Sequence, residues 1–181
     1  MKLSKNNGIV FWVTGLSGAG KTELSKKILK MIEKRFGPTL LVSGDDLRDI
    51  FKLTGYEKRD RYQIAKMYSN FSKFISNQKI NLILAVGALF NKIHTDNRKS
   101  IKNYIEIYIK TEIKTLKKYK KKKIYKQITK NIWGIDLKPE FPKKPDVTIV
   151  NNYRKNLNHL SKDLIKKIIN LKKIKKYLIN G

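Results

Sequence analysis

The sequence contains no cysteine among its 181 residues. Disulfides and thiolate metal sites are therefore excluded, and we expect a protein of the reducing cytoplasm. Long apolar runs are missing as well. The longest, residues 82–86, has the length of a strand, and the charged N-terminus is not followed by the apolar segment of a secretory signal. We expect neither a membrane span nor a leader.

Acidic residues are scarce, because 14 Asp and Glu stand against 42 Lys and Arg, for a formal net charge of +28. Only six of the 42 are arginine, and the excess of lysine, isoleucine and asparagine indicates A- and T-rich codons. A nucleic-acid or membrane-surface protein would also carry such a charge. The lysines are spread along the chain instead of forming one stripe with aromatics, so we expect no specific nucleic-acid partner.

Residues 15–22 match the phosphate-binding pattern G-x-x-x-x-G-K-[ST]. They are Gly15, Leu16, Ser17, Gly18, Ala19, Gly20, Lys21 and Thr22. An apolar run at residues 9–13 indicates a buried strand before this loop, and apolar residues at helical spacing indicate a helix that ends at Phe36. A glycine-rich turn without a ligand is the alternative. The strand, loop and helix stand in the order that this motif requires, so we predict binding of a nucleoside triphosphate.

The chemistry of this motif assigns roles to its residues. Glycines let the backbone N–H groups turn toward an anion at the start of a helix. Lys21 would reach the β- and γ-phosphates of ATP, and the Thr22 hydroxyl would hold Mg²⁺.

Strands and helices alternate along the sequence. Strands are expected at residues 9–13, 39–42, 80–86, 104–109 and 147–150, and helices up to residue 36, near 47–51, at 58–76 and at 157–178. This order predicts an α/β, doubly wound parallel sheet of about five strands with helices on both faces, and ligands at the carboxyl ends of the strands. We expect residues 1–181 to form a single domain. The lysines of 157–178 form either a solvated face or a membrane-surface helix.

The segment between Lys117 and Trp133 loses its periodicity and is rich in lysine. In a phosphoryl-transfer enzyme it would be a short basic lid that closes over phosphates. A solvated loop explains the composition equally well.

Several segments resemble the adenylylsulfate (APS) kinases, and they occur in the same order as in that family. They are residues 8–21 (GIVFWVTGLSGAGK), Gly44-Asp45-Asp46-Leu47-Arg48, Gly55-Tyr56 with Asp60-Arg61, residues 105–109 (IEIYI), and Gly134-Ile135-Asp136 with Glu140, Pro142, Pro145 and Asp146. The resemblance covers residues 8–150. It implies a P-loop kinase fold and transfer of the γ-phosphate of MgATP to the 3′-hydroxyl of adenosine 5′-phosphosulfate.

The resemblance also implies roles for single residues. Asp45 would accept or orient the proton of the attacking hydroxyl, unless it only caps the following helix. Arg48 and Arg61 would grip the anionic group of the acceptor, unless they form surface ion pairs with Asp49 or Asp60. Tyr56 replaces a phenylalanine that stacks on the acceptor base, and a rim or core aromatic is its alternative role.

The acceptor side departs from the family pattern. Ser43 replaces an aspartate, and Ile64, Lys66 and Met67 stand where the family has Asn, Arg and Arg. The family's Ser-Pro-Tyr-Arg becomes residues 88–91 (ALFN), and its Phe-Thr before Gly-Ile-Asp becomes Ile132-Trp133, which we include among the acceptor-binding residues. Losing polar partners changes which nucleotide a site can hold.

Three functions follow as hypotheses. The first is a kinase for adenosine 5′-phosphosulfate or a similar small anionic nucleotide. The second is a divergent relative similar to the kinases of cytidine diphosphoramidate in capsule biosynthesis. The third, from another class, is a catalytically degenerate module that binds nucleotides or nucleic acid. The resemblance also implies a possible homodimer.

Overall fold

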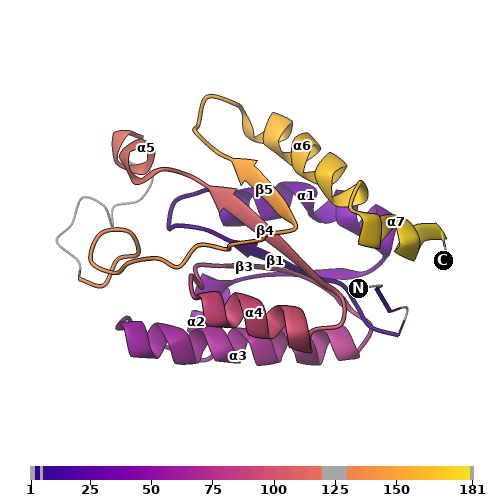
Figure 1. Cartoon of the computed structure of the whole chain (residues 1–181), viewed down its shortest axis with the longest axis horizontal. Coiled ribbons are helices and arrows are strands. Elements are labelled where there is room, and N and C mark those ends of the chain that lie inside the picture. Colours follow the sequence, from indigo (N-terminus) through magenta and orange to yellow (C-terminus); the bar gives the residue numbers. More distant parts are fainter. Residues whose placement is uncertain (1–2, 5, 120–129, 180–181) are drawn as a thin grey trace.

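In a computed structural model the chain folds as a parallel five-stranded sheet between two layers of helices (Figure 1). The structure describes residues 3–4, 6–119 and 130–179. The sheet has the order β2-β3-β1-β4-β5. Its strands are β1 (Val10–Thr14), β2 (Thr39–Ser43), β3 (Asn81–Val86), β4 (Tyr104–Lys110) and β5 (Val147–Val150). The α/β prediction is confirmed, and each strand lies within one residue of its expected bounds.

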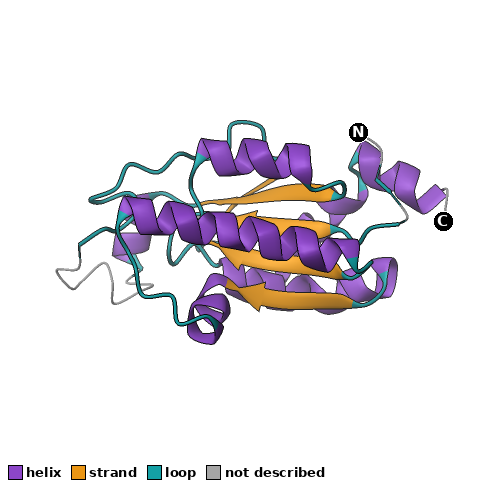
Figure 2. Cartoon of the chain, turned by 90° about the horizontal axis from the view of Figure 1, so that it is seen from below, coloured by secondary structure: helices purple, strands orange, loops and turns teal. Residues whose placement is uncertain are grey.

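Helices cover both faces of the sheet, as Figures 1 and 2 show. Helices α1, α6 and α7 lie on one face, and α2, α3 and α4 lie on the other, while α5 follows β4 beyond the edge of the sheet. The helices are α1 (Lys21–Phe36), α2 (Gly44–Ile50), α3 (Lys58–Asn77), α4 (Asn91–Ser100), α5 (Ile113–Lys118), α6 (Leu157–Ile169) and α7 (Lys172–Ile179).

Strand β1 is the centre of the core, because all five of its residues are buried. Its side chains alternate between the two faces, as the period of a strand requires. Phe11 and Val13 pack in the cluster that contains α1 and α6. Val10 and Trp12 pack in the cluster that contains α2, α3 and α4. Burial on both faces explains why this strand appears in the sequence as a continuous apolar run.

The C-terminal segment corrects one prediction. Residues 157–178 were expected to form one amphipathic helix, but α6 ends at Ile169 with Asn170 as its C-cap, and α7 begins at Lys172. The apolar spacing continues through this break, since Ile168 and Ile174 both lie in the core cluster next to α1. Helices α4 and α5 were not predicted at all.

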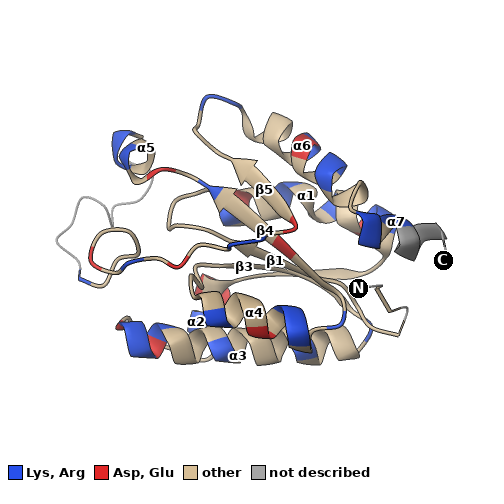
Figure 3. Ribbon diagram, viewed as in Figure 1, with Lys and Arg blue, Asp and Glu red and all other residues tan. Residues whose placement is uncertain are grey.

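The carboxyl ends of the five strands meet at one edge of the sheet, on the left in Figure 1. The loops that follow β1, β2 and β5 therefore lie near one another. Basic residues are spread over helices of both layers, as the sequence predicts (Figure 3). Within the part of the chain that the structure describes, no helix is long and apolar enough to cross a bilayer.

Candidate active site

The phosphate loop, residues 15–22, joins β1 to α1. Gly18 and Gly20 take left-handed backbone angles, with φ of 78° and 91°, which side chains other than glycine rarely tolerate. Gly20 is the N-cap of α1 and has no side chain with which to cap it. The first amides of α1 are therefore left to other acceptors, as at anion sites of helix N-termini.

Lys21, the first residue of α1, folds back over this loop. Its Nζ donates to the carbonyl of Leu16 at 2.9 Å. This contact places the ammonium group across the mouth of the loop, where a phosphate bound by the loop amides would meet it.

A cavity of about 580 Å³ opens beside the loop. It brings together three residues that the sequence assigned to phosphoryl transfer, Lys21, Thr22 and Asp45. Other lining residues come from the segment after β5, which was not predicted to belong to the site. Its lining residues are Asn151, Tyr153, Lys155 and Leu157. The rule that ligands bind at the carboxyl ends of parallel strands was the signal that could have found them.

Asp45 lies at the start of α2 but does not cap it. The N-cap is Ser43, whose Oγ accepts from the Asp46 amide at 3.2 Å, while Asp46 Oδ2 accepts from the Ser43 amide at 2.7 Å. This reciprocal pair is a capping box. The alternative role of Asp45 as helix cap is therefore wrong, and Asp45 lines the same cavity as Lys21 and Thr22.

One group contains Arg48 of α2, Arg61 of α3 and Tyr56 from the segment between these helices. The two guanidinium carbons lie 4.4 Å and 5.4 Å from the centroid of the Tyr56 ring, within the range of cation–π attraction. Tyr56 keeps 53% of its surface exposed. Tyr56 is therefore not a core residue; the rim alternative fits its exposure, and stacking on an acceptor base stays a prediction.

Both arginines also bind backbone carbonyls. Arg48 donates to Leu53 O at 2.8 Å and to Gly55 O at 3.1 Å. Arg61 donates to Tyr56 O and to Asn131 O, each at 2.8 Å. Among the ion pairs of the described residues, neither arginine pairs with Asp49 or Asp60, so the surface ion-pair alternative is wrong there.

The two guanidinium groups repel each other. Burial lowers the pKa of Arg61, and the nearby charge of Arg48 lowers it further. Two neighbouring like charges are stabilised when an anion binds close to both. The pair therefore favours a negatively charged ligand, although neither arginine is among the residues that line the cavity beside the phosphate loop.

Ile132 and Trp133 are buried, at 3% and 4% exposure. The Trp133 ring packs edge-to-face on Phe90 at 5.0 Å, and Phe90 packs on Tyr62 in the same way at 5.3 Å. The guanidinium of Arg61 lies 5.9 Å from the Trp133 ring. These residues therefore form a wall behind Arg61, and their contact with an acceptor stays a prediction.

The lysine-rich segment is described only at its two ends. Helix α5 ends at Lys118, and the chain is described again from Lys130. Residues 120–129, on which the lid prediction mainly rests, lie outside the described residues.

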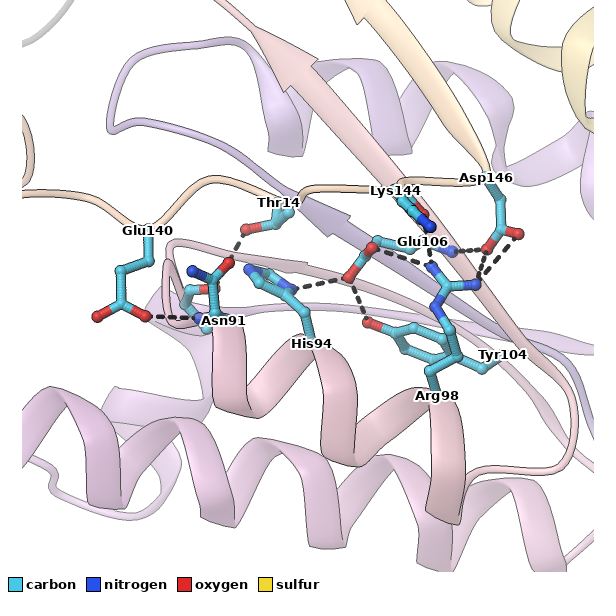
Figure 4. Close-up of polar contacts among 10 residues, drawn as sticks. Thr14, Asn91, His94, Arg98, Tyr104, Glu106, Glu140, Lys144 and Asp146 are labelled. Carbon is cyan, nitrogen blue, oxygen red and sulfur yellow. Dashed lines mark hydrogen bonds and ion pairs between the residues drawn. The ribbon is translucent and has the colours of Figure 1, made fainter.

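Several acidic residues in the family-like segments have structural partners. Glu140 Oε2 accepts from the amide of Asn91 at 2.8 Å and so caps the start of α4 (Figure 4). The buried Glu106 binds His94 and Arg98 of α4, and Asp146 binds Arg98 and the Glu106 amide. These carboxylates hold α4 and β5 against β4, away from the phosphate loop.

The residues of the cavity have the chemistry that Mg²⁺ needs. Mg²⁺ keeps several waters and is commonly held by one or two protein oxygens together with substrate phosphates. The Thr22 hydroxyl and the Asp45 carboxylate line the same cavity as the loop and supply such oxygens. Among the described residues no cluster of three His, Cys, Asp or Glu could hold a metal by itself.

The parallel sheet, the phosphate loop and the neighbouring lysine and aspartate define the class of P-loop kinases. Comparisons with known proteins identify the family more closely. Residues 7–150 match the model of the family described as adenylylsulphate kinase. The chain therefore belongs to the adenylylsulfate kinase family and is a nucleotide kinase.

Individual relatives support this assignment. The chain is 33% identical over 168 residues to the cytidine diphosphoramidate kinase of Campylobacter jejuni, which covers 91% of this chain and 98% of the relative. It is 32% identical over 154 residues to the adenylyl-sulfate kinase of Clostridium acetobutylicum, which covers 82% and 77%. The fold alone is also similar to that of the Mycobacterium tuberculosis APS kinase solved with AMPPNP and APS, with a TM-score of 0.75 at 21% identity, over 90% of this chain and 98% of that one.

Proposed function

We propose that this kinase transfers the γ-phosphate of MgATP to the ribose 3′-hydroxyl of cytidine diphosphoramidate. The observation that carries this choice is the 33% identity to a cytidine diphosphoramidate kinase over nearly the full length of both chains. Adenosine 5′-phosphosulfate is the second candidate, because the family model and the Clostridium relative favour it.

The donor side is built for phosphoryl transfer. The amides of the phosphate loop and Lys21 would bind the β- and γ-phosphates and stabilise the charge that develops during transfer. Mg²⁺, with Thr22 as its ligand from the protein, would neutralise charge on the same phosphates. Asp45 lines the cavity with Lys21, and its carboxylate would orient the acceptor hydroxyl for attack.

The acceptor side offers two cations and an exposed ring. A guanidinium has five N–H donors, and Arg48 and Arg61 each give two of theirs to backbone carbonyls. Donors remain on both for the anionic 5′ group of a nucleotide. Tyr56 keeps 53% of its surface exposed next to them, and its ring could stack on the nucleobase.

The changed residues support an altered acceptor. Ile64 stands where the family has asparagine, and it is buried in the apolar cluster that also contains Leu47 and Tyr68. Met67, at an arginine position, is exposed and carries no charge. Asn91, at another arginine position, is the first residue of helix α4, and its backbone N–H donates to Glu140 Oε2. Contacts that a family acceptor would receive from these three positions cannot form here in the same way.

The test is transfer of labelled γ-phosphate from MgATP to a panel of acceptors. The panel contains cytidine diphosphoramidate, adenosine 5′-phosphosulfate, and plain cytidine and adenosine diphosphates. Rapid labelling of the cytidine diphosphoramidate alone is the expected result. Preferred labelling of adenosine 5′-phosphosulfate would overturn the acceptor assignment in favour of the second candidate. ATP binding without transfer to any acceptor would support the degenerate module.

Two further features stay predictions. A cytoplasmic location rests on the cysteine-free sequence. A homodimer rests on the family resemblance, and a related APS kinase from Thiobacillus denitrificans is described as hexameric. Size-exclusion chromatography with light scattering would measure the oligomeric state.

A further inference from the structure

The turn that follows β5 contacts the phosphate loop through two side chains. Asn151 Nδ2 donates to the carbonyl of Ala19 at 3.0 Å, and the hydroxyl of Tyr153 donates to the carbonyl of Gly18. These two carbonyls belong to consecutive residues of the loop. They are held by a segment that lies more than 130 residues away in the sequence.

The turn is itself fixed. The Asn151 amide donates to Lys110 O of β4 at 2.9 Å, and Asn151 Oδ1 accepts from the Tyr153 amide at 3.1 Å. Tyr153 has a φ of 62°, a left-handed conformation that is unfavourable for a side chain of this size. Such a conformation persists where its surroundings hold it. Here it turns the Tyr153 side chain back toward the phosphate loop.

The phosphate loop needs such support. Gly18 and Gly20 can adopt many backbone conformations, so the loop alone does not favour one arrangement of its amides. In a trans peptide the carbonyl and the next N–H point in opposite directions. A side chain that holds the carbonyl of Gly18 or Ala19 therefore also fixes the direction of the next amide, on which anion binding depends.

We propose that Asn151 and Tyr153 hold the phosphate loop in its anion-binding conformation, and that the Tyr153 hydroxyl is a positioning group for the donor phosphates. This inference rests on the proposed use of the loop by ATP. Burial raises the pKa of Tyr153, so the hydroxyl stays protonated and remains a donor at neutral pH. The ring also packs on Tyr119, with centroids 5.4 Å apart, and Tyr153→Phe preserves that contact.

The experiment compares the native protein with Tyr153→Phe, which removes only the hydroxyl. Calorimetric titration measures the Kd of MgATP and of magnesium tripolyphosphate, which has no nucleoside. We expect Tyr153→Phe to weaken both ligands by a similar factor of about three to ten, the effect of one lost hydrogen bond. In the kinase assay KM for ATP should rise by the same factor, while kcat changes less.

Two controls make the result specific. Tyr108→Phe removes another buried phenol, at a β4 position opposite Thr14, and should leave both Kd values unchanged. Lys21→Ala measures the background binding of polyanions to a chain of charge +28, and titrations in about 0.3 M salt suppress that background.

The outcomes separate the inference from the proposed function. Unchanged Kd values in Tyr153→Phe would overturn the inference while the proposed function stands. Weaker binding of ATP alone would also overturn it, because Tyr153 would then act on the nucleoside and not through the loop. Failure of the native protein to bind MgATP would overturn the proposed function and, with it, the inference.

Discussion

Glu106 Oε2 lies 3.0 Å from Arg98 Nη2, and this pair ties the central part of β4 to helix α4 (Figure 4). Glu106 is 2% exposed; its Oε1 lies 2.8 Å from His94 Nδ1 and accepts from the Tyr104 hydroxyl at 3.1 Å. Arg98 reaches Asp146 at 3.3 Å as well. The carboxylate therefore holds a helix whose sequence has little apolar surface of its own.

Removing this guanidinium should destabilise the fold. In Arg98→Met, Glu106 would remain buried without its main counter-charge, and we expect the free energy of unfolding to fall by about 2 kcal/mol. The value lies below that of a fully buried pair because the Arg98 side chain is 39% exposed. Chemical denaturation measures it. The control is Lys92→Met, which breaks the exposed Lys92–Asp96 pair of the same helix and should change stability little. Equal effects of the two variants would contradict the prediction.

The buried phenol of Tyr104 should make stability fall at high pH. Burial raises the pKa of Tyr104 well above its ordinary value, and the charge of Glu106 raises it further. Below pH 10 both states keep the proton. Above it the unfolded chain releases the proton first, so the free energy of unfolding falls by up to about 1.4 kcal/mol per pH unit for this one group.

The variant Tyr104→Phe isolates that contribution. It loses the hydrogen bond to Glu106, so its stability at neutral pH should be lower. Its stability should nevertheless decline less steeply between about pH 10 and 11 than that of the native protein. Urea denaturation at several pH values gives both slopes, and identical slopes would show that Tyr104 does not hold its proton in the folded state.

The neighbouring residues Asp45 and Asp46 should have separable roles. Asp45→Asn should lower kcat about 10²-fold with little change in the Kd of MgATP, because an amide cannot accept the proton of the attacking hydroxyl. Asp46→Ala removes the capping box of α2, so it should lower the free energy of unfolding by about 1 kcal/mol and keep most of kcat. Stopped assays and thermal unfolding measure the two effects. Loss of MgATP binding in Asp45→Asn would assign Asp45 to the metal or to the fold instead.

The sheet and the place of the phosphate loop between β1 and α1 were predictable because local pattern decides them. The buried run before Gly15 can form only a core strand, and the spacing of Lys21 and Thr22 after it belongs to one kind of loop. The capping of α2 was within reach too, since Ser43 stands three residues before Asp46, as a capping box requires.

Helix α4 could not be predicted from periodicity. Its ten residues include a single apolar one, Ile93, and the rest of its buried side is formed by His94 and Asn97. The acidic partners of this helix are distant in the sequence, Glu106 in β4 and Asp146 just before β5, and they become its neighbours only in the folded chain. The cavity residues that follow β5, among them Asn151 and Tyr153, were missed although ligands are expected at the carboxyl ends of parallel strands.

The last prediction concerns Arg61, which joins the segments of Tyr56 and Asn131 on the proposed acceptor side. Its Nε donates to Tyr56 O and its Nη2 to Asn131 O. Lysine keeps the charge but cannot make both bonds in one plane. We therefore expect Arg61→Lys to raise KM for the acceptor about tenfold, the effect of losing one charge-assisted bond, and to leave KM for ATP unchanged. Arg59→Lys, an exposed position on the same helix, is the matched control. If Arg61→Lys changes KM for ATP and KM for the acceptor equally, Arg61 supports the whole site and does not position the acceptor.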